Sequence, residues 1–345
     1  MSILFAENFN LSSALPDITS YKGWVESGSV GYGSIGTNGP FGDNFFQVRA
    51  DVQIAHPLPA PVTTTVTTGL RACASAPQSP PTSNILVALL SSGNNTQINV
   101  SLNTAGACVI SRGSTTLASV IAPNPTAWNY YELQVTLSAT AGVVILRQNS
   151  TVLVNLTGID TLNDTANPNT AFIALGNPNS GVTDTLAMTH IYVTDNNAPN
   201  AGFLGDVRVY TQQPTADVSA AFTPTGLTPN YENAAKTPPA PTTDFNGSST
   251  VGAEDLFSGA ALPSTVTTIF AVGLEVLWDK QDSGARTVCG VISSAGTVAT
   301  GAAITPVTTP SYAVQQDFFP TNPATAASWT PAQAAAAEFG YKIVS

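Results

Sequence analysis

Side chains that carry out acid–base, nucleophilic or metal chemistry are scarce in this chain. The 345 residues include 21 Asp and Glu, 10 Lys and Arg, two His and three Cys, so charged residues make up 9% of the sequence. An average soluble domain has about 25% charged residues. Small, hydroxyl, amide and β-branched residues take their place. This composition favours strands and turns. It predicts a surface that packs against other proteins or is displayed, more than a surface that carries a catalytic site.

The carboxylates are not spaced for glycoside hydrolysis, which needs two of them facing one cleft. On a lectin-like sandwich they would stand at alternate positions of a strand, and no Glu-x-Asp-x-x-Glu pattern occurs. Glu254 and Asp255 are adjacent, so on a strand they would point to opposite faces, and we expect them in a loop. His56 precedes Pro57 in an expected loop, and His190 lies in an alternating, half-buried strand. Neither accompanies a Gly-x-Ser-x-Gly elbow. The sequence therefore predicts no catalytic residues, no cofactor and no enzymatic activity.

Metal ligands are equally dispersed. Cys73, Cys108 and Cys289 form no Cys-x-x-Cys pair, so we expect free thiols and no zinc. A Cys73–Cys108 disulfide is the alternative. Calcium needs several oxygen ligands close together. Five isolated carboxylates are candidate calcium ligands, although Asp at such positions is typical of turns and helix caps. They are Asp160, Asp164, Asp184, Asp195 and Asp206. We predict no metal site.

Aromatic side chains are the remaining candidates for a binding site. Trp24, Tyr32 and Tyr130 are candidates for stacking on a sugar ring. Trp128 and Tyr131 head an amphipathic strand, so we assign them to core packing.

Charge excludes several partners. The net charge is −11 and the few basic residues are scattered singly. Nucleic acid and anionic membranes are both recognised by basic patches, so we predict neither partner. No apolar run reaches the roughly 20 residues needed to cross a bilayer, and the N-terminus has no signal-peptide pattern.

The elements expected to position any site are strands. From Trp128 to Ser138 apolar and polar residues alternate, which indicates one face in the core and one in water. Returning segments follow at 143–146 and 152–156, and similar segments occur at 45–54, 85–102, 171–175, 188–194, 266–278, 286–292 and 311–315. Short strands at this spacing indicate β-sandwiches or jelly rolls. One short C-terminal helix is expected from the Thr330 cap to Phe339, with Gly340 as its stop.

The expected fold class is therefore all-β, with two β-sandwich or jelly-roll domains. The polar, turn-rich segment 195–200 marks the boundary between residues 1–200 and residues 201–345.

Two regions resemble known families. Residues 128–161, with the opening at 5–9, resemble the concanavalin A-like (laminin-G-like) sandwich. Residues 202–345 resemble a module of tailed-bacteriophage structural proteins. The residues that carry this second resemblance are Phe203–Val209, Pro214–Asp217, Phe222–Thr225, Asn230, Tyr231, Asp282–Arg286, Asn322, Pro323, Trp329, Thr330, Phe339 and Gly340. Phe222 stands where that module has Trp, so the aromatic character is kept.

The resemblance implies a bacteriophage virion structural protein, assembled in the host cytoplasm and associated with the tail as a fibre or minor tail protein. Its implied partners are copies of itself, with a trimer favoured, other virion proteins and a host-surface glycan bound by the first sandwich. A head decoration or head fibre protein is one alternative. A secreted lectin or glycan-active enzyme is an alternative of another class.

Overall fold

The computed structural model describes residues 3–28, 33–48, 52–74, 84–103, 105–177, 185–237, 239–282, 284–308 and 311–345. Strands make up 51% of the chain and helices 5%, so the expected all-β class is confirmed. The chain divides into two compact units, which we call unit 1 (Met1–Thr19 and Gly23–Tyr210) and unit 2 (Ser20–Lys22 and Thr211–Ser345). Residues 201–210, assigned from the sequence to the second domain, therefore belong to unit 1.

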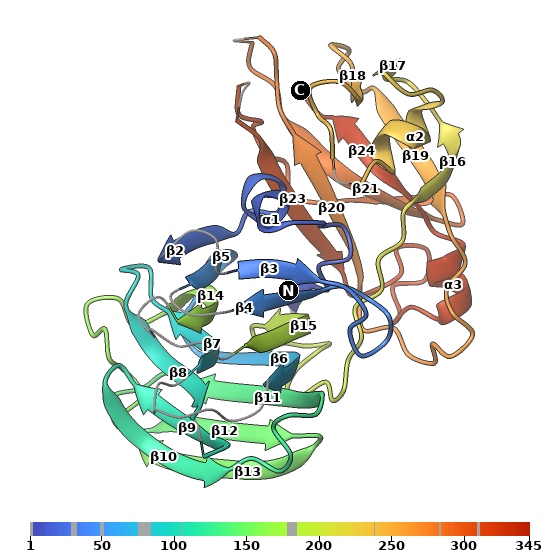
Figure 1. Cartoon of the computed structure of the whole chain (residues 1–345). Helices are drawn as coiled ribbons and strands as arrows, with labels where there is room; N and C mark the ends of the chain where they lie inside the picture. The colour runs from blue at the N-terminus through green and yellow to red at the C-terminus, as the bar shows by residue number, and fades with distance from the viewer. Residues whose placement is uncertain are drawn as a thin grey trace. The chain divides into compact units, whose positions relative to one another are not determined.

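The first sheet of unit 1 has eight antiparallel strands (Figure 1). Its order is β13-β12-β11-β6-β15-β4-β3, and β1 also pairs with β15. The strands are β1 (Ile3–Glu7), β3 (Gly33–Gly36), β4 (Phe45–Val48), β6 (Thr65–Ala74), β11 (Asn129–Thr136), β12 (Gly142–Gln148), β13 (Thr151–Ile159) and β15 (Leu186–Thr194).

The second sheet of unit 1 has seven strands in the order β10-β9-β8-β7-β14-β5-β2. They are β2 (Val25–Gly28), β5 (Val52–Val62), β7 (Asn84–Leu90), β8 (Thr96–Leu102), β9 (Ala107–Arg112), β10 (Thr115–Ile121) and β14 (Thr170–Asn177). One short helix, α1 (Leu15–Tyr21), follows β1.

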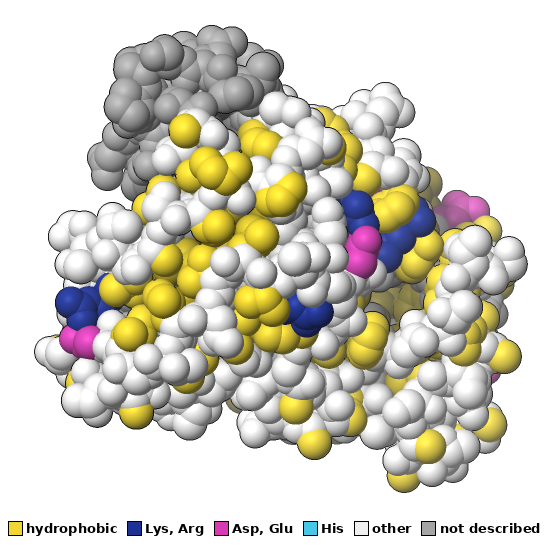
Figure 2. Space-filling model, turned by 90° about the horizontal axis from the view of Figure 1, so that it is seen from below, with side chains coloured by type: hydrophobic (Ala, Val, Ile, Leu, Met, Phe, Trp, Pro, Cys, Tyr) yellow, Lys and Arg dark blue, Asp and Glu magenta, His cyan; other side chains and the backbone are white. Residues whose placement is uncertain are grey.

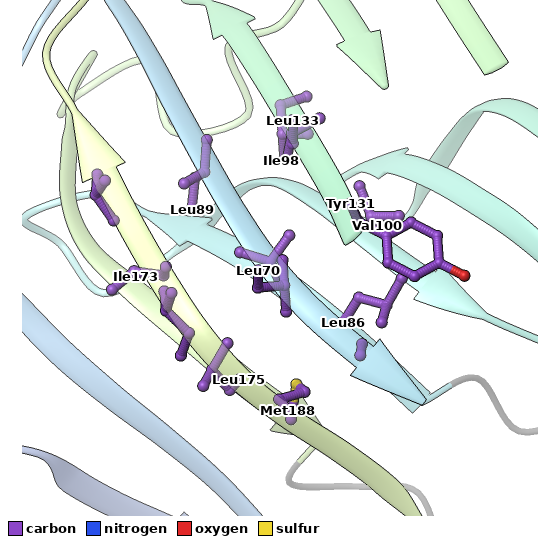
Figure 3. Close-up of a cluster of buried hydrophobic side chains, with 14 of the residues drawn as sticks. Leu70, Leu86, Leu89, Ile98, Val100, Tyr131, Leu133, Ile173, Leu175 and Met188 are labelled. Carbon is purple, nitrogen blue, oxygen red and sulfur yellow. The ribbon is translucent and has the colours of Figure 1, made fainter. Parts of the chain in front are cut away.

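The two sheets enclose one hydrophobic core (Figure 3). Leu70, Leu133 and Met188 enter it from the eight-stranded sheet, and Leu86 and Ile173 enter it from the seven-stranded sheet. Period-two alternation selects these residues, since every second side chain of a strand points to the same face. The result is the β-sandwich expected for this part of the chain.

Unit 2 is also built from antiparallel strands. A five-stranded sheet has the order β16-β19-β24-β21-β22, and two ribbons pair β17 with β18 and β20 with β23. The strands are β16 (Pro214–Ser219), β17 (Thr223–Thr225), β18 (Phe245–Gly247), β19 (Glu254–Gly259), β20 (Val272–Trp278), β21 (Val288–Ser294), β22 (Thr297–Thr300), β23 (Ala313–Phe319) and β24 (Glu338–Ile343). Two short helices, α2 (Asn230–Ala234) and α3 (Pro331–Ala335), complete the described elements.

The expected C-terminal helix forms but is shorter than expected. Its capping box is present, because the Thr330 side chain accepts from Gln333 N–H and the Gln333 side chain accepts from Thr330 N–H. The helix ends at Ala335, and Phe339 lies in β24, at the centre of the five-stranded sheet. Gly340 is therefore no helix stop: a Cβ there would overlap the carbonyl oxygen of Asp255 on the neighbouring strand.

Three further expectations are corrected. Segment 45–54 is divided between the two sheets of unit 1, as β4 and β5. His56 lies within β5 and packs on Phe5 and Trp24, because β5 continues through its prolines. Glu254 and Asp255 open β19 instead of lying in a loop.

Candidate functional site

The outer face of the eight-stranded sheet, opposite the core, carries an unusual set of polar side chains. Tyr130 on β11 lies opposite Arg71 on β6, while Glu132 lies opposite Gly69, which pairs with Tyr192 on β15. Tyr192 donates its hydroxyl to Glu132 Oε1 at 2.7 Å. Gly69 leaves room for the Tyr192 ring to reach across β6 to Glu132, since a Cβ at residue 69 would overlap that ring.

An irregular segment, which we call the strap (Phe203–Tyr210), lies on this face. The Gly205 N–H donates to Glu132 Oε1 at 2.8 Å, and the Leu204 N–H donates to the Tyr192 hydroxyl. Arg71 forms an ion pair with Asp206 through both carboxylate oxygens. The strap explains why Glu132 is only 1% exposed, although the alternation of β11 predicts that it faces water.

A buried His–Asp pair lies at the end of the strap. β15 loses register with β6 between Thr189 and Tyr192, and His190 has φ +50° at this irregularity. Its Nδ1 accepts from the Val209 N–H, so the proton of neutral imidazole is on Nε2, 2.6 Å from Asp43 Oδ2. Burial lowers the pKa of His190 to about 4, although Asp43 opposes this shift. The imidazole is therefore neutral near pH 7.

Phe41 presents a ring to solvent beside this pair. It belongs to the turn 39–43 and is 42% exposed. The Arg208 guanidinium carbon lies 3.9 Å from the centre of the Phe41 ring and 4.5 Å from that of Tyr210. The Arg71 guanidinium carbon lies 4.7 Å from the Phe41 ring centre. Stacking on aromatic rings holds guanidinium planes in place and leaves their edges free to donate.

We call this set the Phe41 surface; it comprises Phe41, Arg71, Tyr130, Arg208 and Tyr210. Two of its buried polar atoms, Arg71 Nε and Arg208 Nε, have no hydrogen-bond partner among the described residues, while the Tyr130 hydroxyl is contacted by the Val207 N–H. Buried polar groups are nearly always partnered, so unpartnered ones mark a place where water or a ligand is expected.

The predicted stacking residues lie elsewhere or point inward. Trp24 and Tyr130 are each 1% exposed, so neither ring can meet a sugar in this structure. Trp24 packs on Phe5 and Phe9 in the core, and Tyr32 lies outside the described residues. Trp128, assigned from the sequence to the core, is half-buried beside Phe45, with 5.6 Å between ring centres.

Sequence reasoning missed Phe41, Arg71 and Arg208. Phe41 stands alone in a Gly- and Pro-rich turn, and the two arginines are 137 positions apart. The only signal in the sequence was that Phe41 is flanked by Pro and Gly. These residues favour a turn, and a turn exposes the side chain at its tip.

The calcium candidates have structural partners. Asp164 accepts from Asn95 Nδ2 and Ser91 Oγ, which lowers its pKa to about 2 and ties two loops together. Asp160 pairs with Arg112, and Asp195 accepts from the Asn197 N–H. Asp184 lies outside the described residues. Within the described ranges, no group of three or more His, Cys, Asp or Glu side chains is placed to hold a metal ion.

The other candidate residues are also structural. Asp255 is fully buried and accepts from Phe222 N–H and Asn230 Nδ2, while Glu254 pairs with Lys342. All three cysteines are free thiols, as expected. No helix in the described parts of the chain is long and apolar enough to span a bilayer.

Comparisons with known proteins give no family. No protein-family model matches the chain, and no curated protein matches its sequence. Among solved structures, a sialidase is similar at 9% identity and TM-score 0.40, over 55% of this chain and 18% of the sialidase. The lectin UEA-II complexed with galactose is similar at 15% identity and TM-score 0.35, over 50% of this chain and 92% of the lectin. A carbohydrate esterase from the Shiga toxin-encoding bacteriophage phi24B is similar at 12% identity and TM-score 0.40, over 56% of this chain and 97% of the esterase.

These structures correct the exclusion of an enzyme. The sequence predicts no enzymatic activity because paired carboxylates and a nucleophile elbow are both missing, yet the similar structures include a sialidase and a carbohydrate esterase. At these identities and TM-scores the likeness assigns no activity to this chain.

Proposed function

We propose that unit 1 is a lectin-like module that binds glycan at the Phe41 surface. The observation that carries this proposal is the 42% exposed Phe41 ring, flanked by the guanidinium groups of Arg71 and Arg208. The apolar C–H face of a sugar ring packs on such an aromatic ring. Its hydroxyl oxygens accept from the neighbouring N–H groups, which fixes orientation.

The surroundings support a preformed site. Arg208 is held between Phe41 and Tyr210, so little side-chain entropy is lost when it donates to a ligand. The buried Asp43–His190 pair lies behind it, and Asp43 Oδ2 is 3.9 Å from the Arg208 guanidinium. These contacts fix the positions of the donors before a sugar arrives.

The first test is binding of the purified chain to an immobilised glycan panel, followed by calorimetry on the best ligand. Phe41→Ala should weaken binding at least tenfold, because it removes the packing face. The control is Ile121→Ala, which truncates another apolar side chain, 65% exposed, on β10. Unchanged binding by the Phe41→Ala variant, or equal loss in both variants, would contradict the proposal.

We further propose that this module belongs to a virion structural protein of a tailed bacteriophage, associated with its tail. The sequence resemblance of residues 202–345 supports this setting. Figure 2 adds a surface on which charged side chains are few and uncharged groups prevail. Such a surface can pack against copies of the chain or other virion proteins with little loss of charge hydration.

Labelling intact particles with an antibody against this chain, viewed by electron microscopy, tests the virion setting. Label on tails supports the proposal, with contacts among copies of the chain expected there as a trimer. Label on heads supports the head decoration or head fibre alternative. Absence from particles, with the glycan binding retained, would favour a secreted lectin or glycan-active protein.

A further inference from the structure

We infer that the Phe41 surface selects acidic glycans, with a uronic acid carboxylate paired to Arg71, and that Asp206 of the strap occupies that place when no ligand is bound. This inference rests on the proposed glycan binding and names its ligand class. The observation behind it is that the two residues of the Arg71–Asp206 ion pair differ in burial and in the structure that supports them.

The Arg71 side chain is mostly buried, whereas the Asp206 side chain is half exposed and its described contact is with Arg71. The Arg71 side chain is 11% exposed and rises from the middle of β6, with its guanidinium carbon 4.7 Å from the Phe41 ring centre and 5.8 Å from the Tyr130 ring centre. The Asp206 side chain is 52% exposed and belongs to the strap, which has no ladder hydrogen bonds. A free carboxylate can therefore replace Asp206 without disturbing the sheet.

The exposed edges of the two guanidinium groups call for an acceptor, because an arginine side chain can only donate. The Arg208 side chain is 31% exposed and the Arg71 side chain 11%. A carboxylate accepts at two oxygens and forms a bidentate pair with a guanidinium, which a neutral hydroxyl cannot match. Arg208 adds a second set of N–H donors, and Asp43, whose Oδ2 lies 3.9 Å from the Arg208 guanidinium, partly balances its charge because His190 is neutral.

The exposed Phe41 ring favours a sugar acid over an acidic peptide. It places an apolar face beside the guanidinium edges, and a uronic acid residue offers a C–H face and a carboxylate on one rigid ring. The net charge of −11 opposes any polyanion. At 0.15 M salt, however, charges beyond about 8 Å are largely screened, so the local arginines decide binding.

The test compares polygalacturonate with its fully methyl-esterified form, which has the same backbone and no charge. The full-length chain should bind the acid form at least tenfold more tightly at 0.15 M salt. Arg71→Gln should lose this preference. Asp206→Asn should raise the affinity for polygalacturonate about two- to fivefold, the equivalent of releasing one exposed ion pair.

Asp160→Asn is the matched control, because Asp160 is a similarly exposed carboxylate paired with an arginine, Arg112, away from the Phe41 surface. Its affinity for polygalacturonate should equal that of the unchanged chain. If Arg71→Gln fails to fold by thermal melting, the Asp206→Asn and Asp160→Asn comparison decides alone.

Each other outcome overturns the inference. Equal binding of the acid and ester forms, with loss in Phe41→Ala, leaves the glycan-binding proposal standing and removes the acidic preference. Equal binding of poly-L-glutamate would assign the surface to acidic peptides. Absence of binding to the glycan panel as well as to both polymers would contradict the proposed function itself.

Discussion

At the scale of single residues, His190 is the titratable group whose charge state matters most for the candidate site. Its side chain is fully buried and contacts the strap through Val209, and Arg208, Arg71 and Asp43 are the charged groups that act on it. Protonation would add an N–H at Nδ1, where the Val209 N–H now donates. The same proton would therefore charge a buried ring and break a bond that holds the strap.

The first prediction follows from the direction of this pKa shift. Burial lowers the pKa of folded His190 to about 4, whereas a free histidine has a pKa near 6.5. Between these values the unfolded state binds more protons, so stability is full above about pH 6.5 and falls as the pH is lowered towards 4. Thermal melting between pH 7.5 and 4 measures this loss.

The comparison variant is His190→Asn. Asn tolerates the positive φ at this position, and its side-chain oxygen accepts from an N–H as the imidazole does. The variant should be less stable near pH 7 but should show a shallower decline between pH 6.5 and 4. Parallel curves for the two proteins would mean that other groups cause the acid sensitivity.

Some site residues could not be found from the sequence, for a physical reason. Trp24 and Tyr130 have the right residue type, but exposure depends on which segment covers them. Tyr130 is buried on a face where its strand pattern predicts water, because the strap crosses it. Nothing local in β11 encodes that covering segment, which is about 70 positions further along the chain.

At the scale of elements, the positions of the strands could be predicted from the sequence. The ends of the elements and the pairing of the strands were harder to predict. Alternation from Trp128 onwards predicts β11 to β13, and the Thr330 capping box predicts the start of α3, since both signals depend only on nearby residues. The end of α3 was mispredicted because Gly340 has two uses. A glycine after a helical pattern indicates a C-cap, but here close approach of Asp255 requires it.

The second prediction tests this role of Gly340. Gly340→Ala should destabilise unit 2 by about 3 kcal/mol, because the new methyl overlaps the carbonyl oxygen of Asp255 and β24 pairs on both sides. Gly247→Ala is the control, since a Cβ there meets only the Phe245 ring at 3.6 Å. Chemical denaturation of both variants measures the difference. A loss below about 1 kcal/mol for Gly340→Ala would show that the strands separate easily.

At the scale of the whole molecule, the strap sets the boundary between the two units. The turn-rich segment 195–200 has the composition of a linker, and the sequence places the boundary there. In the structure the next ten residues still belong to unit 1, up to Tyr210. They supply hydrogen-bond donors to Glu132, Tyr192 and His190, which the sheet itself does not satisfy.

The last prediction compares two shortened chains, residues 1–210 and residues 1–200. The longer one keeps the strap, so it should unfold in one cooperative transition near the temperature at which unit 1 melts in the full chain. The shorter one leaves the buried Glu132 and His190 each without one partner and removes Asp206 from Arg71. Each hydrogen bond from the strap contributes about 1 kcal/mol to the free energy of unfolding, so losing these bonds together with the packing of the strap uses up much of a domain's stability. Calorimetry should therefore show a melting temperature at least 10 °C lower for residues 1–200, or no transition. Equal melting temperatures would mean that the strap lies on the sheet without stabilising it.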